Sequence, residues 1–153
     1  MEENIDKFPC FVADTSFLAA YLLNGSCDDE MSGCAEEIEY ILENNGQIYV
    51  PQLFWFEIGN ALLCKTRRHA GRTTMSKADA LDCMYDLGQL PIVTDLQPAS
   101  EIRQRIFALA DEYKLSYYDA SYLELARRYS ITLKTYDASL KAAFYRRAKK
   151  RYN

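Results

Sequence analysis

The sequence predicts an α/β fold in which helices cover both faces of a mostly parallel sheet. Short apolar runs alternate with longer stretches of helical periodicity along the chain, and turn-forming residues separate them. Strands that alternate with helices in this way are joined by right-handed crossovers and lie parallel. The length of 153 residues suits one domain. We expect residues 1–153 to form it, with the core at about 9–145 and a basic tail at 146–153.

The first elements follow from hydrophobic runs and turn residues. Residues 9–14 are an apolar run that ends in an acid and predict a buried strand, and residues 15–23 predict the helix that it feeds. A turn-rich connection at 24–33 leads to residues 35–42, where isoleucine and leucine recur at helical intervals. Asparagine and glycine close that helix, and residues 47–50 predict a second strand.

Capping residues predict the next two helices. Pro51 suits the first turn of a helix that runs to about residue 68. A loop at 70–74 follows, and Ser76 is placed to cap another helix. We expect that helix to end at Gly88.

The rest of the chain continues the alternation of strands and helices. The predicted elements are a strand at 90–94, a helix at 98–113, a helix at 116–129, a strand at 131–135 and a last helix at 138–149. Together with the earlier elements they give four strands, each followed by at least one helix.

Composition excludes several classes of protein. No apolar stretch approaches the roughly 18 residues of a membrane span, and the acidic N-terminus lacks the apolar region of a signal peptide, so we expect a cytoplasmic location. Five cysteines without a Cys-x-x-Cys pair argue against a disulfide framework or a zinc site. The single histidine, His69, excludes a histidine-rich metal site. The net charge of −4 is uneven, because residues 146–151 hold five of the 18 basic residues.

Four carboxylates stand where strand-like runs give way to helices, namely Asp14, Glu57, Asp119 and Asp137. Taken one at a time, the aspartates have a simple structural explanation as helix caps. Asp119 also follows Ser116 by three residues, which resembles a capping box. Glu57 is different, because its helical neighbours are apolar and a glutamate on such a face is costly unless it is paired or binds a cation.

Taken together, the four acids point to a metal site. The carboxyl ends of parallel strands meet at one edge of a sheet, so we expect these side chains to surround one hollow. Like charges at that distance repel one another and raise their pKa values, and a bound Mg²⁺ or Mn²⁺ would relieve the repulsion. Such a cation can hold a phosphate group and activate a water molecule. The residues therefore predict metal-dependent phosphate chemistry.

Four blocks of the sequence resemble, in order and spacing, the signature blocks of PIN-domain ribonucleases. They are residues 11–16, 56–62, 115–126 and 133–137. The similarity extends over about residues 10–145 and is closest to the VapC-type toxins of bacterial toxin–antitoxin pairs. It implies a three-layer α/β/α sandwich with four to five strands and an endoribonuclease that uses Mg²⁺ or Mn²⁺ to hydrolyse RNA with a metal-activated water.

The resemblance also implies roles for individual residues. The expected catalytic and metal-binding residues are Asp14, Glu57, Asp119 and Asp137. Ser16 and Thr135 match supporting polar positions of the family, and Asn60 is the polar companion of Glu57 one helical turn later. Proteins of this kind form homodimers and are silenced by an antitoxin, so a second copy and an antitoxin are the expected protein partners beside the RNA.

Basic and aromatic residues near the acids have two interpretations each. Lys65, Arg67, Arg68 and Arg72 either complement a helix dipole at a solvated end or form a rim that guides RNA phosphates. The basic tail is interpreted as a solvated terminus. The tyrosines around Asp119 are interpreted as packing residues rather than base-stacking platforms. These are Tyr117, Tyr118 and Tyr122.

Three other functions are less consistent with these residues than a nuclease. A haloacid-dehalogenase-like phosphatase would begin with a block like Asp14-Thr15-Ser16, but it needs a second aspartate where Ser16 stands. A receiver-like switch domain needs an adjacent acidic pair that is not evident. A non-catalytic PIN-like interaction module would keep the fold without turnover, and the presence of all four acids disfavours it.

Overall fold

The computed structural model describes residues 8–23, 33–96 and 98–150, and most of the predicted 24–33 connection and the end of the basic tail lie outside this range. The elements along these residues are β1 (Cys10–Ala13), α1 (Thr15–Leu22), α2 (Gly33–Glu43), β2 (Gln47–Pro51), α3 (Leu53–Thr66), α4 (Lys77–Gln89), β3 (Ile92–Asp95), α5 (Ser100–Tyr113), α6 (Tyr117–Tyr129), β4 (Thr132–Lys134) and α7 (Ala138–Lys150). The predicted order of strands and helices is confirmed.

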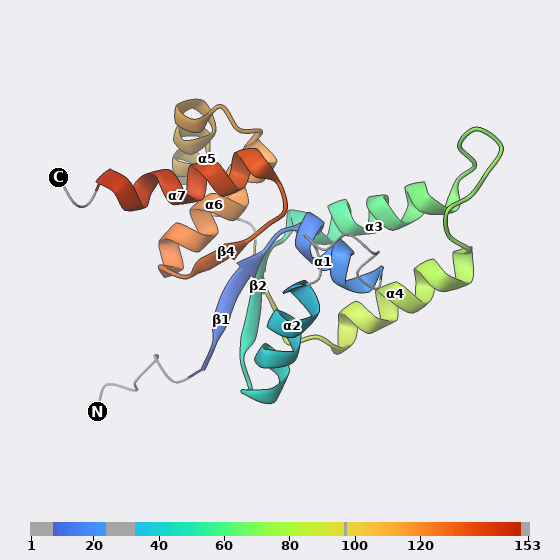
Figure 1. The fold of residues 1–153 in the computed structure, drawn as a ribbon. Helices are drawn as coiled ribbons and strands as arrows, with labels where there is room; N and C mark the ends of the chain where they lie inside the picture. Colours follow the sequence, from blue (N-terminus) through green and yellow to red (C-terminus); the bar gives the residue numbers. More distant parts are fainter. Residues whose placement is uncertain (1–7, 24–32, 97, 151–153) are drawn as a thin grey trace.

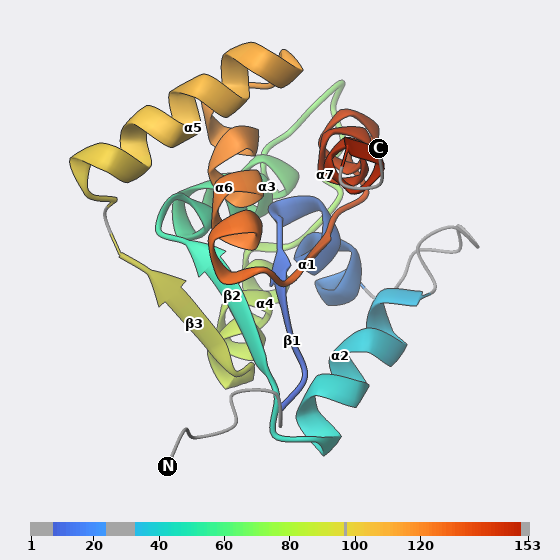
Figure 2. The ribbon, with the colours of Figure 1, turned by 90° about the vertical axis from the view of Figure 1, so that its left-hand side faces the viewer.

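The described strands form one parallel sheet with the order β3-β2-β1-β4. Val12 of β1 is in register with Tyr49 of β2 on one side and with Leu133 of β4 on the other. Figure 2 shows β3, β2 and β1 side by side. The chain steps outward from β1 to β3 and then returns to the far side of β1. The strand order therefore reverses between β1 and β4, which is where ligand crevices form in open α/β sheets.

Helices cover both faces of the sheet and make it the middle layer of a sandwich. Helices α1 to α4 lie on one side, and α5, α6 and α7 lie on the other (Figure 1). This arrangement confirms the predicted α/β class with three layers. Helix α6 is buried over the whole run from Ala120 to Ala126, because it packs on the sheet and is itself covered by α5 and α7.

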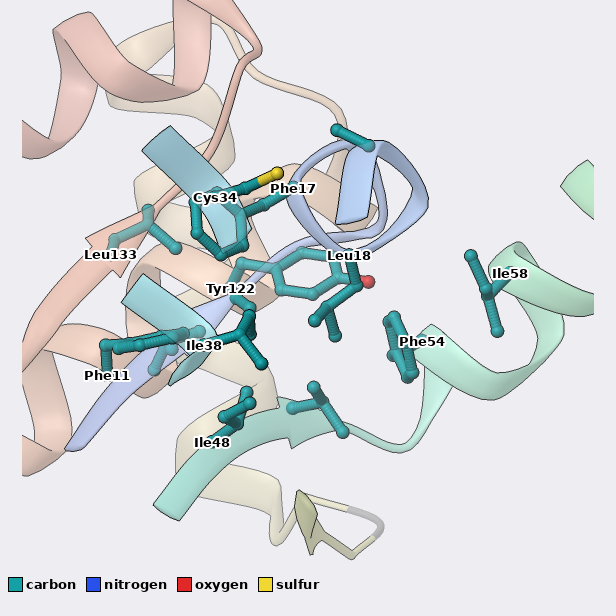
Figure 3. Packing of buried hydrophobic residues seen from close by; sticks show 14 of the residues in the cluster. Phe11, Phe17, Leu18, Cys34, Ile38, Ile48, Phe54, Ile58, Tyr122 and Leu133 are labelled. Carbon is teal, nitrogen blue, oxygen red and sulfur yellow. The ribbon is translucent and has the colours of Figure 1, made fainter. Parts of the chain in front are cut away.

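The core fills the space between the sheet and its helices. Phe11 and Ile48 from neighbouring strands meet Leu18 of α1, Phe54 of α3 and Tyr122 of α6. Figure 3 shows these side chains together, with the Tyr122 ring inside the cluster. The Tyr122 side chain is only 1% exposed. Its prediction as a packing residue is therefore confirmed.

Two boundaries differ from the sequence prediction. Pro51 is the last residue of β2, in register with Asp95 of β3, and is not part of a helix. A proline is tolerated at a strand end because only one ladder hydrogen bond is lost there. The next backbone N–H, that of Gln52, donates to the Asp95 carbonyl at 3.1 Å, so sheet pairing continues past the proline and delays the helix to Leu53.

Gly88 also behaves differently from the prediction. Helix α4 continues through Gln89, since the buried Leu87 holds its last turn against the core. The turn after α2 is closed as predicted, with Asn45 in the left-handed region at φ 53°. Gly46 is required beside it, because a Cβ there would collide with the Pro9 carbonyl oxygen.

None of the helices among the described residues is both long and apolar enough to pass through a membrane.

Candidate active site

Asp14 is the most buried of the predicted acids, at 6% exposure. It directly follows β1 in extended conformation and caps α1, because its Oδ1 accepts the Phe17 backbone N–H at 3.0 Å. Two hydroxyl groups complete its surroundings. Ser16 donates to Oδ1 at 2.6 Å, and Thr135 donates to Oδ2 at 2.5 Å. The predicted supporting residues Ser16 and Thr135 therefore both contact Asp14.

The same hydroxyls tie the ends of β1 and β4 together. The Asp137 backbone N–H donates to Thr135 Oγ1 at 2.9 Å, and the Tyr136 N–H donates to Ser16 Oγ at 2.9 Å. Asp137 is exposed and caps α7, with its Oδ1 accepting the Leu140 N–H at 2.7 Å. Asp137 and Asp14 thus lie at neighbouring strand ends, connected through Thr135.

Glu57 lies in the first half of α3, which follows β2, and is half-buried. Its Oε2 accepts two hydroxyl hydrogen bonds, from Tyr122 at 2.5 Å and from Thr15 at 3.0 Å. The two hydroxyl oxygens are themselves 3.2 Å apart. The pairing that a glutamate on this helix face requires is provided by hydroxyl groups. Asn60 does not contribute to it, since its side chain is exposed and its Oδ1 accepts a hydrogen bond from the Cys64 thiol.

Asp119 occupies the first turn of α6 in the arrangement that the sequence suggested. Its backbone N–H donates to Ser116 Oγ at 3.0 Å, and Ser116 donates back to its Oδ2 at 2.6 Å. The capping explanation is therefore confirmed for all three aspartates. It does not exclude a second role, because the caps belong to helices that begin at one edge of the sheet.

The electrostatics of Asp14 show that the acids are close enough to interact. Burial raises the pKa of Asp14, and the nearby charge of Asp119 raises it further, while the hydrogen bonds from Ser16, Thr135 and the Phe17 N–H oppose the rise. Within the described part of the chain, no lysine or arginine pairs with any of the four acids. Among these residues, no basic side chain compensates their negative charge.

The donor chemistry fits a hard divalent cation, but the side chains do not form a complete set of ligands. The acids and the hydroxyls around them offer only oxygen atoms, which Mg²⁺ and Mn²⁺ prefer. Among the residues that the structure describes, no three acidic, cysteine or histidine side chains lie close enough together to count as a metal site. The described acids therefore share an edge of the sheet without forming a preformed cluster of ligands, and the expected cage stays a prediction.

The predicted RNA-binding residues lie elsewhere. Lys65 is in the last turn of α3, and Arg67, Arg68 and Arg72 follow in the loop between α3 and α4. Figure 1 shows this loop at the far end of a protruding helical hairpin. Lys65 is eight positions after Glu57 in the sequence, a distance of about 12 Å along the helix axis at the usual rise per residue. An RNA-binding role for this cluster stays a prediction.

A groove of about 390 Å³ opens beside the acids and was not foreseen. It lies between the ends of β2 and β3, the start of α3, and helices α5 and α6. Phe56 and Tyr118 line it, and each is the chain neighbour of a predicted catalytic acid. Both side chains are largely exposed, and so is Leu96, which also lines the groove.

Sequence analysis also missed two groups of polar residues. Thr15 and Tyr122 contact Glu57, and the signal for Tyr122 was its position one helical turn after Asp119 on the same side of α6. The second group is an ion-pair network along the wall of the groove. Its members are Asp95, Arg105, Glu124 and Arg128. Nothing in local spacing links Asp95 to α6.

The PIN domain model matches residues 11–148, which is nearly the whole chain. The chain belongs to the PIN-domain family. Since PIN domains are nucleases, membership supports a nuclease as the enzyme class. The predicted resemblance is confirmed at the level of the family. The roles of the four acids stay a prediction.

Two solved structures illustrate the similarity of fold. PAE2754 from Pyrobaculum aerophilum is 22% identical with a TM-score of 0.59, covering 87% of this chain and 83% of that one. The toxin VapC20 from Mycobacterium tuberculosis, described as cleaving the sarcin–ricin loop, is 17% identical with a TM-score of 0.57, covering 87% of this chain and 94% of that one. No match was found among curated proteins.

Proposed function

We propose that this PIN domain is an endoribonuclease that depends on Mg²⁺ or Mn²⁺, and that it is the toxin of a toxin–antitoxin pair of the VapC type. The observation that carries the nuclease proposal is the group of acids at one sheet edge. Asp14, Glu57 and Asp119 are supported by hydroxyl and backbone donors, and no basic side chain in the described part of the chain neutralises them. A buried carboxylate such as that of Asp14 is normally paired with a basic group or a metal ion.

In this proposal each acid has a distinct task. Asp14, Asp119 and Asp137 would hold the cation, and Glu57 would bind it as well or orient the attacking water. The cation supplies charge neutralisation at the phosphate and lowers the pKa of a bound water. The protein side chains fix the position of the reactants, with Ser16 and Thr135 holding Asp14 in place.

The proposed partners are RNA, an antitoxin and a second copy of the chain. The VapC20 toxin of similar fold supports an RNA substrate. Exposed apolar side chains around the groove, such as Phe56 and Leu96, support a protein partner, because soluble monomers rarely leave such patches uncovered. Arg67 and Arg68 at the tip of the α3–α4 hairpin are the proposed site of RNA phosphate contacts.

The nuclease proposal is tested by Asp119→Asn. An asparagine oxygen still accepts the Ser116 hydroxyl, so the cap of α6 and the fold should persist. We expect cleavage of RNA in Mn²⁺ to fall by at least about a hundredfold, as for the loss of one main electrostatic group in an active site. The measurement is the cleavage rate of a labelled single-stranded RNA, with circular dichroism to check the fold.

Asp111→Asn is the matched control, because Asp111 is an exposed acid on α5 that pairs only with Lys114. It should cleave at the wild-type rate. Full activity of Asp119→Asn would contradict the assignment of the site. If the wild-type protein cleaves no RNA in Mg²⁺ or Mn²⁺, the non-catalytic interaction module becomes the better explanation.

A further inference from the structure

We propose that Tyr122 and Thr15 are positioning residues for Glu57, whose Oε2 they hold so that Oε1 is available to the cation or the attacking water. The inference rests on the proposed nuclease function and adds two residues to it. Both lie outside the set of acids, and neither would itself touch the substrate.

The geometry around Glu57 is that of one fixed oxygen and one available oxygen. Tyr122 donates to Oε2 at 2.5 Å and Thr15 donates to the same atom at 3.0 Å. Within the described part of the chain, Oε1 accepts no hydrogen bond. A carboxylate with both donors on one oxygen keeps the acceptor capacity of the other for a ligand.

Both donors are rigid. The Tyr122 ring is 1% exposed and packed in the core, and Figure 3 shows its hydroxyl oxygen directed away from the strands that flank the ring. Thr15 is β-branched and stands in the first turn of α1, which restricts its χ1 angle. Glu57 by contrast is a long side chain that would lose rotamer freedom on binding a ligand. Donors that are already fixed reduce that loss.

The positions of the two donors in the chain connect Glu57 to the other acids. Thr15 directly follows Asp14, and Tyr122 is one helical turn after Asp119 on α6. Any displacement of β1 or α6 that moved Asp14 or Asp119 would move a donor to Glu57 as well. The two hydroxyl groups therefore maintain the positions of the three acids relative to one another.

Burial of the tyrosine hydroxyl supports the same role. The hydroxyl is enclosed in the core and lies within hydrogen-bond distance of the Glu57 carboxylate, to which it donates. A phenylalanine would keep the ring packing and remove only the donor.

The experiment compares Tyr122→Phe and Thr15→Val with the wild-type protein. Mn²⁺ affinity is measured by titration calorimetry without RNA, and RNA cleavage is measured at saturating Mn²⁺. We expect Tyr122→Phe to weaken Mn²⁺ binding or cleavage by about 10–100-fold, the usual effect of removing a group that orients a metal ligand. The loss should fall on kcat, with KM for RNA unchanged.

Two controls separate positioning from general damage. Thr15→Ser keeps the hydroxyl and should restore most of what Thr15→Val loses. Tyr49→Phe removes a tyrosine hydroxyl that donates to Gln47 on the exposed side of β2 and should behave as wild type. Wild-type Mn²⁺ binding and cleavage in both Tyr122→Phe and Thr15→Val would overturn the inference.

A double-mutant cycle supplies the sharpest criterion. If Tyr122 acts through Glu57, then Tyr122→Phe should have no further effect on cleavage or Mn²⁺ affinity once Glu57→Gln is present. Fully additive losses would overturn the inference while leaving the nuclease intact. A wild-type protein that neither binds Mn²⁺ nor cleaves RNA would instead refute the proposed function, and the inference would fall with it.

Discussion

Two groups of carboxylates lie at the same edge of the sheet and are held in opposite ways. Among the described residues, Asp14 and Glu57 in the candidate active site accept hydrogen bonds only from hydroxyls and a backbone N–H. In the wall of the neighbouring groove, Glu124 is 3% exposed and accepts hydrogen bonds from the guanidinium groups of Arg105 and Arg128.

The ion-pair network joins three elements. Arg128 on α6 binds Asp95 at the end of β3 through two nitrogens, at 3.2 and 2.6 Å. It also binds Glu124 one turn earlier on the same helix. The hydrogen bonds to Asp95 and the charge of Glu124 raise the pKa of Arg128 above its ordinary value. Arg105 brings α5 to the same carboxylate, so the network fixes α5 and β3 to α6.

Pairing with arginine distinguishes the structural acids from the proposed catalytic acids in this fold. Glu124 and Asp95 have their charge neutralised within the protein and have no need of a ligand. Asp14 is nearly as buried, yet its hydrogen-bond partners are neutral, and the charge of another acid, Asp119, acts on it. Leaving such charge uncompensated is unfavourable for the metal-free protein and suits a cation that arrives later.

The largest expected effect on stability is that of a glutamate-to-glutamine substitution in the ion-pair network, compared with the same substitution in the candidate active site. Glu124→Gln should cost about 3 kcal/mol, because it removes the buried carboxylate that Arg105 shares with the part-buried Arg128, although Arg128 keeps Asp95. A loss of that size lowers the melting temperature by about 6–12 °C in a chain of this length. Glu57→Gln should cost about 1 kcal/mol or less, because the Tyr122 and Thr15 hydroxyls can still donate to an amide oxygen.

Thermal unfolding followed by circular dichroism measures both variants. The comparison also predicts a crossed result in cleavage assays. Glu57→Gln should lose RNA cleavage although it is stable, whereas folded Glu124→Gln should retain it. Equal destabilisation by the two substitutions would mean that the two groups do not differ as their contacts suggest.

A second, smaller effect is the stabilisation of the wild-type protein by Mn²⁺. A ligand that binds only the folded state adds about 2.7 kcal/mol at a hundred times its Kd, which corresponds to about 5–10 °C in melting temperature. Asp14→Asn should abolish the gain, and Glu124→Gln should keep it. Scanning calorimetry with Mn²⁺ and with EDTA measures the shift, and an equal gain in all three proteins would argue against the proposed cation site.

The smallest effect concerns the pH dependence of stability without metal. Since burial raises the pKa of Asp14, the folded protein holds this proton to higher pH than the unfolded chain. The stability that it contributes is present below the unfolded pKa of about 4 and is lost as pH rises through the higher folded pKa. In EDTA, Asp14→Asn should lack this decline.

The measurement is the difference in melting temperature between wild type and Asp14→Asn as a function of pH. The wild-type protein should fall relative to the variant as pH increases from about 4. Adding Mn²⁺ at neutral pH should reverse the order of the two proteins. Parallel curves over the whole range would show that Asp14 is not perturbed by burial.

Local features of the sequence were enough to predict the order of the elements and the capping aspartates, and to single out the four acids of the candidate site. These features are local, since strand runs, helical periodicity and caps such as Ser116 with Asp119 depend on residues within a few positions of each other. Predictions from local rules were wrong where strand pairing opposed them. Pro51, for example, pairs with Asp95 of β3 and belongs to the sheet instead of the helix.

The hydrogen-bond and ion-pair partners of the acids become visible in the tertiary structure alone. Tyr122 meets Glu57 across 65 residues, and Thr135 meets Asp14 across 121. Arg128 reaches Asp95 across 33. No periodicity in the sequence encodes such pairs, because they arise from how α6 packs against the sheet and how β4 returns beside β1. As a result of this packing, Asp95 and Glu124 pair with arginines. Asp14 and Glu57 accept hydrogen bonds from hydroxyl groups and a backbone N–H among the described residues.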